Sequence, residues 1–157
     1  MPTVPRAVVD GLARAAEALD ALGDVNWFWQ HGDFCLNNLI VAPQSVGIID
    51  FDEFGATSVP LQDEIGLGVS VAQLSAGEDG IAAVAKHISS CVQSTLARHP
   101  ALSPFVRELL LHYLVWRVNR AYAVPQRQAA RAKLLATLLA VAESPASFLD
   151  SQSDLEI

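Results

Sequence analysis

The sequence predicts an α+β chain that is mostly helical and carries one short β-hairpin. Several stretches repeat apolar residues at the spacing of an amphipathic helix. Two short aliphatic runs, at 39–42 and 46–51, flank Pro43-Gln44-Ser45, which is the pattern of a hairpin. The length of 157 residues and a hydrophobic content of 52% suit one domain with a buried core.

The first predicted helix covers residues 5–22. Pro5 suits a first helical turn, and Gly23 suits a C-terminal stop. An apolar and aromatic stretch at 25–29 predicts an extended segment, and the polar stretch at 31–38 predicts a loop. The hairpin follows this loop, and a second loop at 52–62 leads to the helices.

Helical patterns dominate the rest of the sequence. A helix from Asp63 to about Leu74 is expected, although its glycines at 66 and 68 lower the helix propensity. Three more are predicted: from Ile81 to a stop at Pro100, from Ser103-Pro104 to about Ala123, and over 126–141. Residues 144–157 form a polar, acidic tail. We therefore expect a single lobe at 1–143.

The charge distribution divides the chain. The net charge is −7 and the pI is about 4.9, which argues against nucleic-acid binding. No Lys or Arg occurs between Arg14 and Lys86, whereas basic residues prevail from Lys86 to Lys133. Acidic clusters without a nearby cation favour divalent metals or cationic ligands. Most scattered charges, Glu64 included, are expected to be solvated.

The two cysteines point to a reducing compartment. Cys35 and Cys91 form neither a CxxC motif nor a disulfide framework. No signal-peptide pattern and no apolar run of membrane-spanning length is present. We therefore expect a cytoplasmic protein that binds neither membranes nor nucleic acids. Trp29 is expected in a core or an interface.

Two polar segments carry the chemistry. The first, at 31–38, reads His-Gly-Asp-Phe-Cys-Leu-Asn-Asn, and the second, at 48–52, reads Ile-Ile-Asp-Phe-Asp. The hairpin between them should return Asp50 to the neighbourhood of Asn38. A carboxylate and an amide oxygen are suitable ligands for Mg²⁺. A further carboxylate at Asp33 could orient a hydroxyl nucleophile, which is what phosphoryl transfer requires.

This order of motifs resembles the catalytic loop and metal-binding Asp of kinases. Gly32, in place of the protein-kinase Arg, and Asp-Phe-Asp at 50–52 are similar to the aminoglycoside phosphotransferase and choline-kinase group. Val59-Pro60-Leu61-Gln62-Asp63 is similar to the Pro-x-x-Asp element of that group. The resemblance covers roughly residues 5–75 in ordered motifs, and the later helices only in general character.

The resemblance implies the C-terminal lobe of the protein-kinase-like fold. Its catalytic loop would be 31–38, its metal-Asp segment 48–54 and its helical subdomain 63–143. Mg²⁺ and ATP, or another nucleoside triphosphate, would be the cofactors. The implied roles are a catalytic base at Asp33, magnesium ligands at Asn38 and Asp50, structural support of the loop from His31 and Asp63, and an acidic surface for a cationic substrate at Asp52 and Glu53.

The resemblance also implies a Gly-rich loop and a Lys that hold the triphosphate. The 30 residues before His31 contain neither. We therefore expect a truncated or split version of the fold. Apolar surface at Trp27, Phe28 and the helix 5–22 should then be covered by a partner chain, by self-association or by a rearranged fold.

Three functions remain open. The first is a phosphotransferase that acts on a hydroxyl of a small molecule of unspecified identity. The second is a non-catalytic kinase-like module that binds a small molecule or a partner. The third is a two-metal phosphoesterase built on residues 31, 33, 38 and 50, which would need further ligands. Each residue also has a plainer interpretation: Asp33 as a turn residue, Asn38 as the start of the hairpin, Asp50 as a strand-end cap, and Asp52 and Glu53 as solvated charges.

Overall fold

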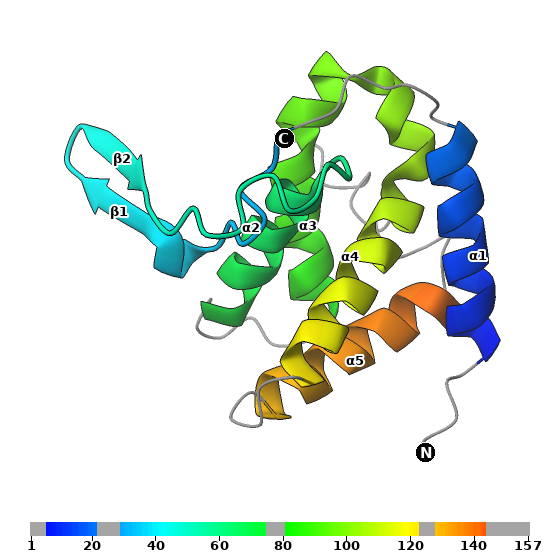
Figure 1. Cartoon of the computed structure of the whole chain (residues 1–157). Coiled ribbons are helices and arrows are strands. Elements are labelled where there is room, and N and C mark those ends of the chain that lie inside the picture. Colours follow the sequence, from blue (N-terminus) through cyan, green and yellow to red (C-terminus); the bar gives the residue numbers. More distant parts are fainter. Residues whose placement is uncertain (1–5, 22–28, 75–80, 123–127, 144–157) are drawn as a thin grey trace. The chain divides into compact units, whose positions relative to one another are not determined.

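The computed structural model describes residues 6–21, 29–74, 81–122 and 128–143. Within these ranges the chain is mostly helical with one two-stranded antiparallel hairpin, which confirms the predicted secondary-structure class (Figure 1). The predicted extended segment at 25–29 lies outside the described residues except for Trp29. In chain order the elements are α1 (Arg6–Ala21), η1 (Leu36–Asn38), β1 (Leu39–Ala42), β2 (Ser45–Ile48), α2 (Gln62–Leu74), α3 (Ile81–Arg98), η2 (Pro100–Phe105), α4 (Val106–Tyr122) and α5 (Gln128–Glu143).

The chain divides into two compact units, 24–100 and the two flanking stretches 1–23 and 101–157. We call the first the loop unit and the second the helical unit. In the helical unit α4 packs against both α1 and α5. Its fully buried side chains are aliphatic, including Leu109, Leu110 and Leu114. Removal of these side chains from water is the main force that holds this unit together.

In the loop unit α2 packs against α3. Ile65 and Ile88 are fully buried there. A Cβ on Gly68 would lie 2.7 Å from the Cα of Ile88, so the two backbones can approach this closely only because residue 68 is glycine. The glycine that weakens the sequence prediction of this helix is therefore what allows its packing.

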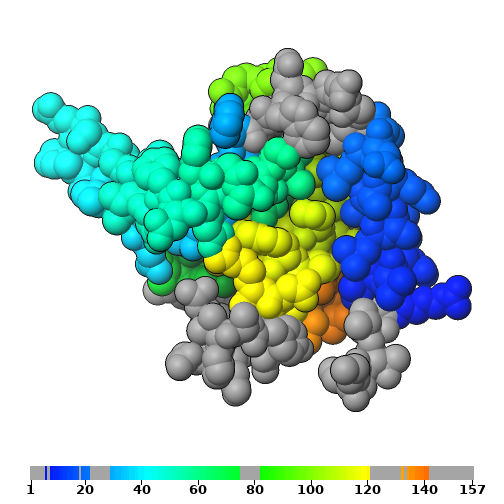
Figure 2. All heavy atoms as spheres, in the orientation of Figure 1, coloured from blue at the N-terminus to red at the C-terminus, as the bar shows by residue number. Residues whose placement is uncertain are grey.

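The hairpin pairs β1 with β2 in the register Leu39↔Ile48 to Ala42↔Ser45, which leaves a two-residue turn at 43–44. It projects away from α2 and α3 (Figures 1 and 2). The second strand ends at Ile48 and not at 51 as predicted. Asp50 adopts a left-handed φ of 62°, which turns the backbone out of the extended conformation and ends the pairing.

The boundary before α4 also differs from the prediction. Ser103 and Pro104 lie in the 3₁₀ helix η2, and α4 begins at Val106. The tighter 3₁₀ turn accommodates Pro104, which has no backbone N–H to donate. None of the described helices combines the length and the apolar composition needed to cross a membrane.

Candidate active site

Asp63 fastens the loop 31–38 to the start of α2. Its Oδ2 accepts a hydrogen bond from the backbone N–H of His31 at 2.5 Å, and its Oδ1 accepts one from Gly32 at 3.0 Å. Burial raises the pKa of the Asp63 carboxyl above its ordinary 3.8, although the two N–H donors act in the opposite direction. One carboxylate thus holds two consecutive peptide groups of the loop.

Gly32 is the residue that lets the loop turn. Its φ is +87°, a conformation that side chains disfavour. A Cβ at this position would also lie 2.5 Å from the carbonyl oxygen of Glu53. Both constraints select glycine, so the feature that separates this motif from that of protein kinases has a local steric cause.

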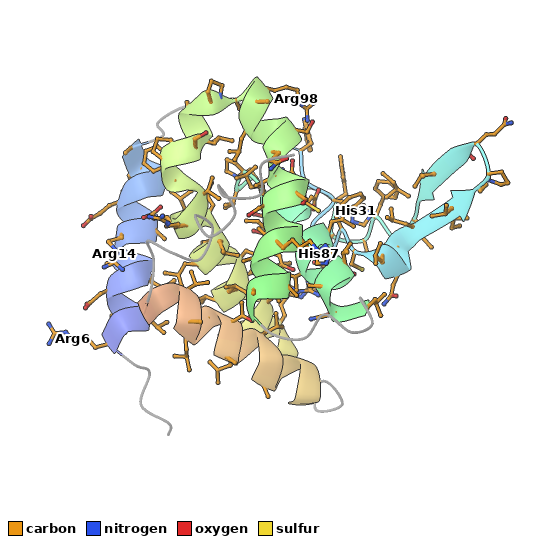
Figure 3. The ribbon with its side chains drawn as sticks, turned by 180° about the vertical axis from the view of Figure 1, so that it is seen from behind. Arg6, Arg14, His31, His87 and Arg98 are labelled. Carbon is orange, nitrogen blue, oxygen red and sulfur yellow. The ribbon has the colours of Figure 1, made fainter. Side chains whose placement is uncertain are left out.

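His31 links the loop to the segment that carries Asp50. Its Nε2 lies 2.9 Å from the carbonyl oxygen of Ile49. Because a carbonyl can only accept, Nε2 carries the proton in this contact. The ring is only 6% exposed and packs against Phe34 and Phe51, with centroid distances of 5.8 and 4.8 Å. Figure 3 shows His31 between the hairpin and the helices α2 and α3.

Asn38 connects the two polar segments. Its side-chain Nδ2 donates to the carbonyl oxygen of Asp33 at 2.9 Å, and its own carbonyl accepts the N–H of Ile49 at 3.0 Å. The side chain is buried, and the bond made by Nδ2 leaves Oδ1 as the atom that could bind a cation. Two hydrogen bonds therefore bring Asp33, Asn38 and the residue before Asp50 together.

Asp50 stands where the chain leaves the hairpin. It is exposed, and its left-handed φ is unusual for a residue with a side chain. Such strained residues cluster at functional sites, where the surrounding structure fixes them. Here the bonds of His31 and Asn38 to Ile49 hold the preceding peptide in place.

The other predicted residues differ in their exposure. Asp33 is half-buried, as is Glu53, whereas Asp52 is exposed. No three His, Cys, Asp or Glu residues of the described chain gather into a metal site. Of the two predicted magnesium ligands, only Asp50 is one of these four residue types, because Asn38 would contribute an amide oxygen. Both side chains carry hard oxygen atoms of the kind that Mg²⁺ binds.

Two further polar side chains shape the loop and were not predicted. Gln30 is buried, its Oε1 accepts the N–H of Asp63 at 2.9 Å, and its carbonyl accepts the N–H of Gly55 at 3.0 Å. Ser70, on α2, accepts the N–H of Leu36 at 2.9 Å. The sequence offers only a weak signal for Gln30, a polar residue directly before His31, and none for Ser70.

A cavity of about 350 Å³ lies beside His31 and Phe51, with mainly aromatic and aliphatic walls. Glu64 lines it and accepts a hydrogen bond from Thr95 at 2.5 Å, so the expectation that Glu64 is simply solvated is wrong. Trp29 also lines it, yet 78% of this residue is exposed, so of the two expected positions the core is excluded and an interface stays a prediction. Trp29 stacks on Phe54 with a centroid distance of 5.5 Å, which keeps part of one ring face from water.

The segment that carries most of these hydrogen bonds, residues 30–63, lies within a stretch that matches a known sequence family. Residues 4–63 match the model of the APH phosphotransferase enzyme family. The resemblance predicted from the motifs is confirmed over this stretch, which includes all the candidate site residues of the loop, Asp50 and Asp63. No curated protein and no solved structure matches the chain.

Proposed function

We propose that this chain is an ATP-dependent phosphotransferase that transfers a phosphoryl group to a hydroxyl of a small molecule. The observation that carries the proposal is the pair of hydrogen bonds that joins Asp33, Asn38 and Ile49. The match of residues 4–63 to a phosphotransferase family supports the same reaction class. The alternative of a non-catalytic binding module predicts no phosphoryl transfer and is decided by the experiments below.

In this proposal the Asp33 carboxylate orients the acceptor hydroxyl and takes its proton as the oxygen attacks the γ-phosphorus of ATP. The bond between that phosphorus and the β–γ bridging oxygen breaks, and ADP leaves. Asn38, through Oδ1, and Asp50 would hold Mg²⁺, which neutralises charge on the phosphates when bound. Asp52 and Glu53 would face a cationic part of the acceptor. His31 and Asp63 would act through the backbone, because their side chains form hydrogen bonds with peptide groups of the loop and of Ile49.

Nucleotide binding tests the cofactor part of the proposal. We expect calorimetry to detect binding of ADP in the presence of Mg²⁺, and we expect the Asp50→Ala variant to lose it. Asp10→Asn is the matched control, because it removes the same charge from an exposed residue of α1. Equal binding by the Asp50→Ala variant and the wild type would exclude Asp50 as a metal ligand.

Phosphoryl transfer tests the catalytic part. Transfer from [γ-³²P]ATP to a panel of amino alcohols, sugars and aminoglycosides should fall by at least about 100-fold in Asp33→Asn, the range expected for loss of a general base. Mg-nucleotide binding by this variant should stay within about twofold of wild type. Magnesium-dependent binding without transfer to any acceptor would favour the non-catalytic module.

A further inference from the structure

The cavity beside His31 belongs to the loop unit, because all the residues that line it fall within 24–100. Its volume of about 350 Å³ is at the lower end of the range for ligand pockets, which is roughly 300–1,000 Å³. Its walls include Trp29, which is 78% exposed, and Phe51 and Phe54, which are about half exposed. The cavity therefore offers an open aromatic rim to one small molecule.

Glu64 lines this cavity with a carboxylate of which one oxygen is unpaired. Its Oε1 accepts a hydrogen bond from Thr95, whereas Oε2 is buried and has no hydrogen-bond partner within the described structure. A buried carboxylate oxygen without a donor costs free energy, and a bond to a ligand N–H would recover it. Oε2 is covered, but the terminal torsion of a glutamate is soft, so a small turn of the carboxylate brings this oxygen to the cavity.

The charge of the cavity is negative. Asp63 and Glu64 both line it, and no Lys or Arg is among the described residues that do so. Arg98 donates to the hydroxyl of Thr95 at 3.3 Å and forms no ion pair with Glu64 in the described part of the chain. Burial raises the pKa of the Cys91 thiol, and the charge of Glu64 adds to this shift. The cavity therefore favours a cation over an anion or a neutral molecule.

His31 carries a second unpaired acceptor. Its side chain lines the cavity and is only 6% exposed, and its Nδ1 has no hydrogen-bond partner among the described residues. Because Nε2 carries the proton that goes to Ile49, Nδ1 of the neutral ring can only accept. The unpaired atoms of Glu64 and His31 are thus both acceptors, which favours a ligand with several N–H donors.

We propose that this cavity binds the primary ammonium group of a small amine with an apolar body, at a site separate from the reacting groups. The N–H groups of such a cation can reach Glu64 and His31, while its body contacts the aromatic walls, whose ring faces attract a cation. A quaternary ammonium has no N–H and would leave Oε2 unpaired. None of Asp33, Asn38 and Asp50 lines the cavity, so the site is independent of the proposed phosphoryl transfer.

Titration of the ¹⁵N-labelled wild type with 2-phenylethylamine, without nucleotide or Mg²⁺, tests the class of ligand. We expect the indole signal of Trp29 and the amide signals of Leu67 and Cys91 to shift saturably, with a Kd of the order of 1 mM. 2-Phenylethanol, which lacks the charge, and the N-trimethyl analogue, which lacks the N–H, should each bind at least about tenfold more weakly. Equal affinity of either analogue, or no saturable shift up to about 20 mM amine, would overturn the proposal.

Substitutions in the cavity test its location, with the Cys91 amide signal as the readout. Glu64→Gln keeps the shape of the side chain and removes its charge, so we expect the amine to bind at least about tenfold more weakly. Glu17→Gln, the matched control at an exposed position of α1, should leave the affinity within about twofold of wild type. Trp29→Ala changes an exposed residue and should therefore fold, and the loss of one wall should weaken binding by about threefold. Wild-type affinity in both cavity variants would refute the site.

The acidic surface at Asp52, proposed above to face the phosphoryl acceptor, is the competing position for the amine. Asp52→Asn should bind 2-phenylethylamine as the wild type does. Weaker binding in Asp52→Asn with unchanged binding in Glu64→Gln would place the amine at that surface and overturn the cavity as its site. This result would leave the proposed phosphoryl transfer standing, because the titration contains no nucleotide and reads no reaction.

Discussion

The helical unit and the loop unit are held together in different ways. In the helical unit, the aliphatic side chains of α4 are buried where α1 and α5 pack against it. Its formal charge is balanced, with eight acids and eight bases over residues 1–23 and 101–157. In the loop unit, single polar side chains fix the backbone of the loop, and acids outnumber bases by nine to two.

Every candidate site residue lies in the loop unit, and none lies in the helical unit. In the loop unit one carboxylate or one amide holds several peptide groups. Apolar packing is spread over many contacts and adapts to small changes, whereas a buried N–H that loses its acceptor has no substitute. We therefore expect single substitutions to disturb the loop unit more than the helical unit.

The largest expected effect is that of Asp63→Ala. The variant leaves the N–H groups of His31 and Gly32 without their acceptor, and hydrogen bonds to a charged group contribute strongly. We expect the free energy of unfolding to fall by about 3 kcal/mol at pH 7, measured by urea denaturation. Asp52→Ala, which removes an exposed acid, should change it by less than about 0.5 kcal/mol. Similar losses in both variants would refute the anchoring role of Asp63.

Two helix glycines provide a matched test of the comparison between the units. A Cβ at Gly68 in α2 would meet backbone atoms of Ile88, whereas a Cβ at Gly11 in α1 would meet the flexible end of Leu111. We expect Gly68→Ala to cost about 2 kcal/mol of unfolding free energy, because backbone cannot move aside cheaply. Gly11→Ala should change it by less than about 1 kcal/mol, because alanine favours the helix and Leu111 can shift. A larger loss for Gly11→Ala would reverse the comparison.

The smallest effect concerns pH. Burial lowers the pKa of His112, on α4, below its ordinary 6.5. The unfolded chain therefore takes up this proton first, and the stability that the neutral ring contributes is lost as the pH falls below 6.5 toward the lower folded value. Asp63 has the opposite linkage: its raised pKa adds stability as the pH falls through that value toward 3.8.

Urea denaturation at several pH values between 5 and 8 measures the His112 contribution. The wild type should lose stability at the acidic end of this range, and His112→Leu should reduce that loss. An unchanged pH profile in the variant would show that burial of His112 does not carry the effect. His99, which is exposed, is the control position, and His99→Gln should leave the profile as it is in the wild type.

The sequence predicts the helices and the hairpin well because both have a repeating pattern of apolar residues. The sequence-based prediction misplaces the end of β2, because a pattern of hydrophobicity does not reveal the left-handed conformation of Asp50. It also misses Gln30 and Ser70, whose roles depend on hydrogen bonds to backbone far away in the sequence. The roles of Asp33, Asn38 and Asp50 were inferred from ordered motifs and remain predictions.

The most direct test of the account is whether a divalent metal binds between Asn38 and Asp50. Titration of the ¹⁵N-labelled protein with Mn²⁺, followed by NMR, reports the position of the ion through line broadening. We expect the amide signals of Asp33, Asn38 and Asp50 to broaden together, to recover when excess Mg²⁺ is added, and to stay sharp in Asp50→Ala. Broadening confined to acids elsewhere, with these three signals unchanged, would contradict a shared metal site.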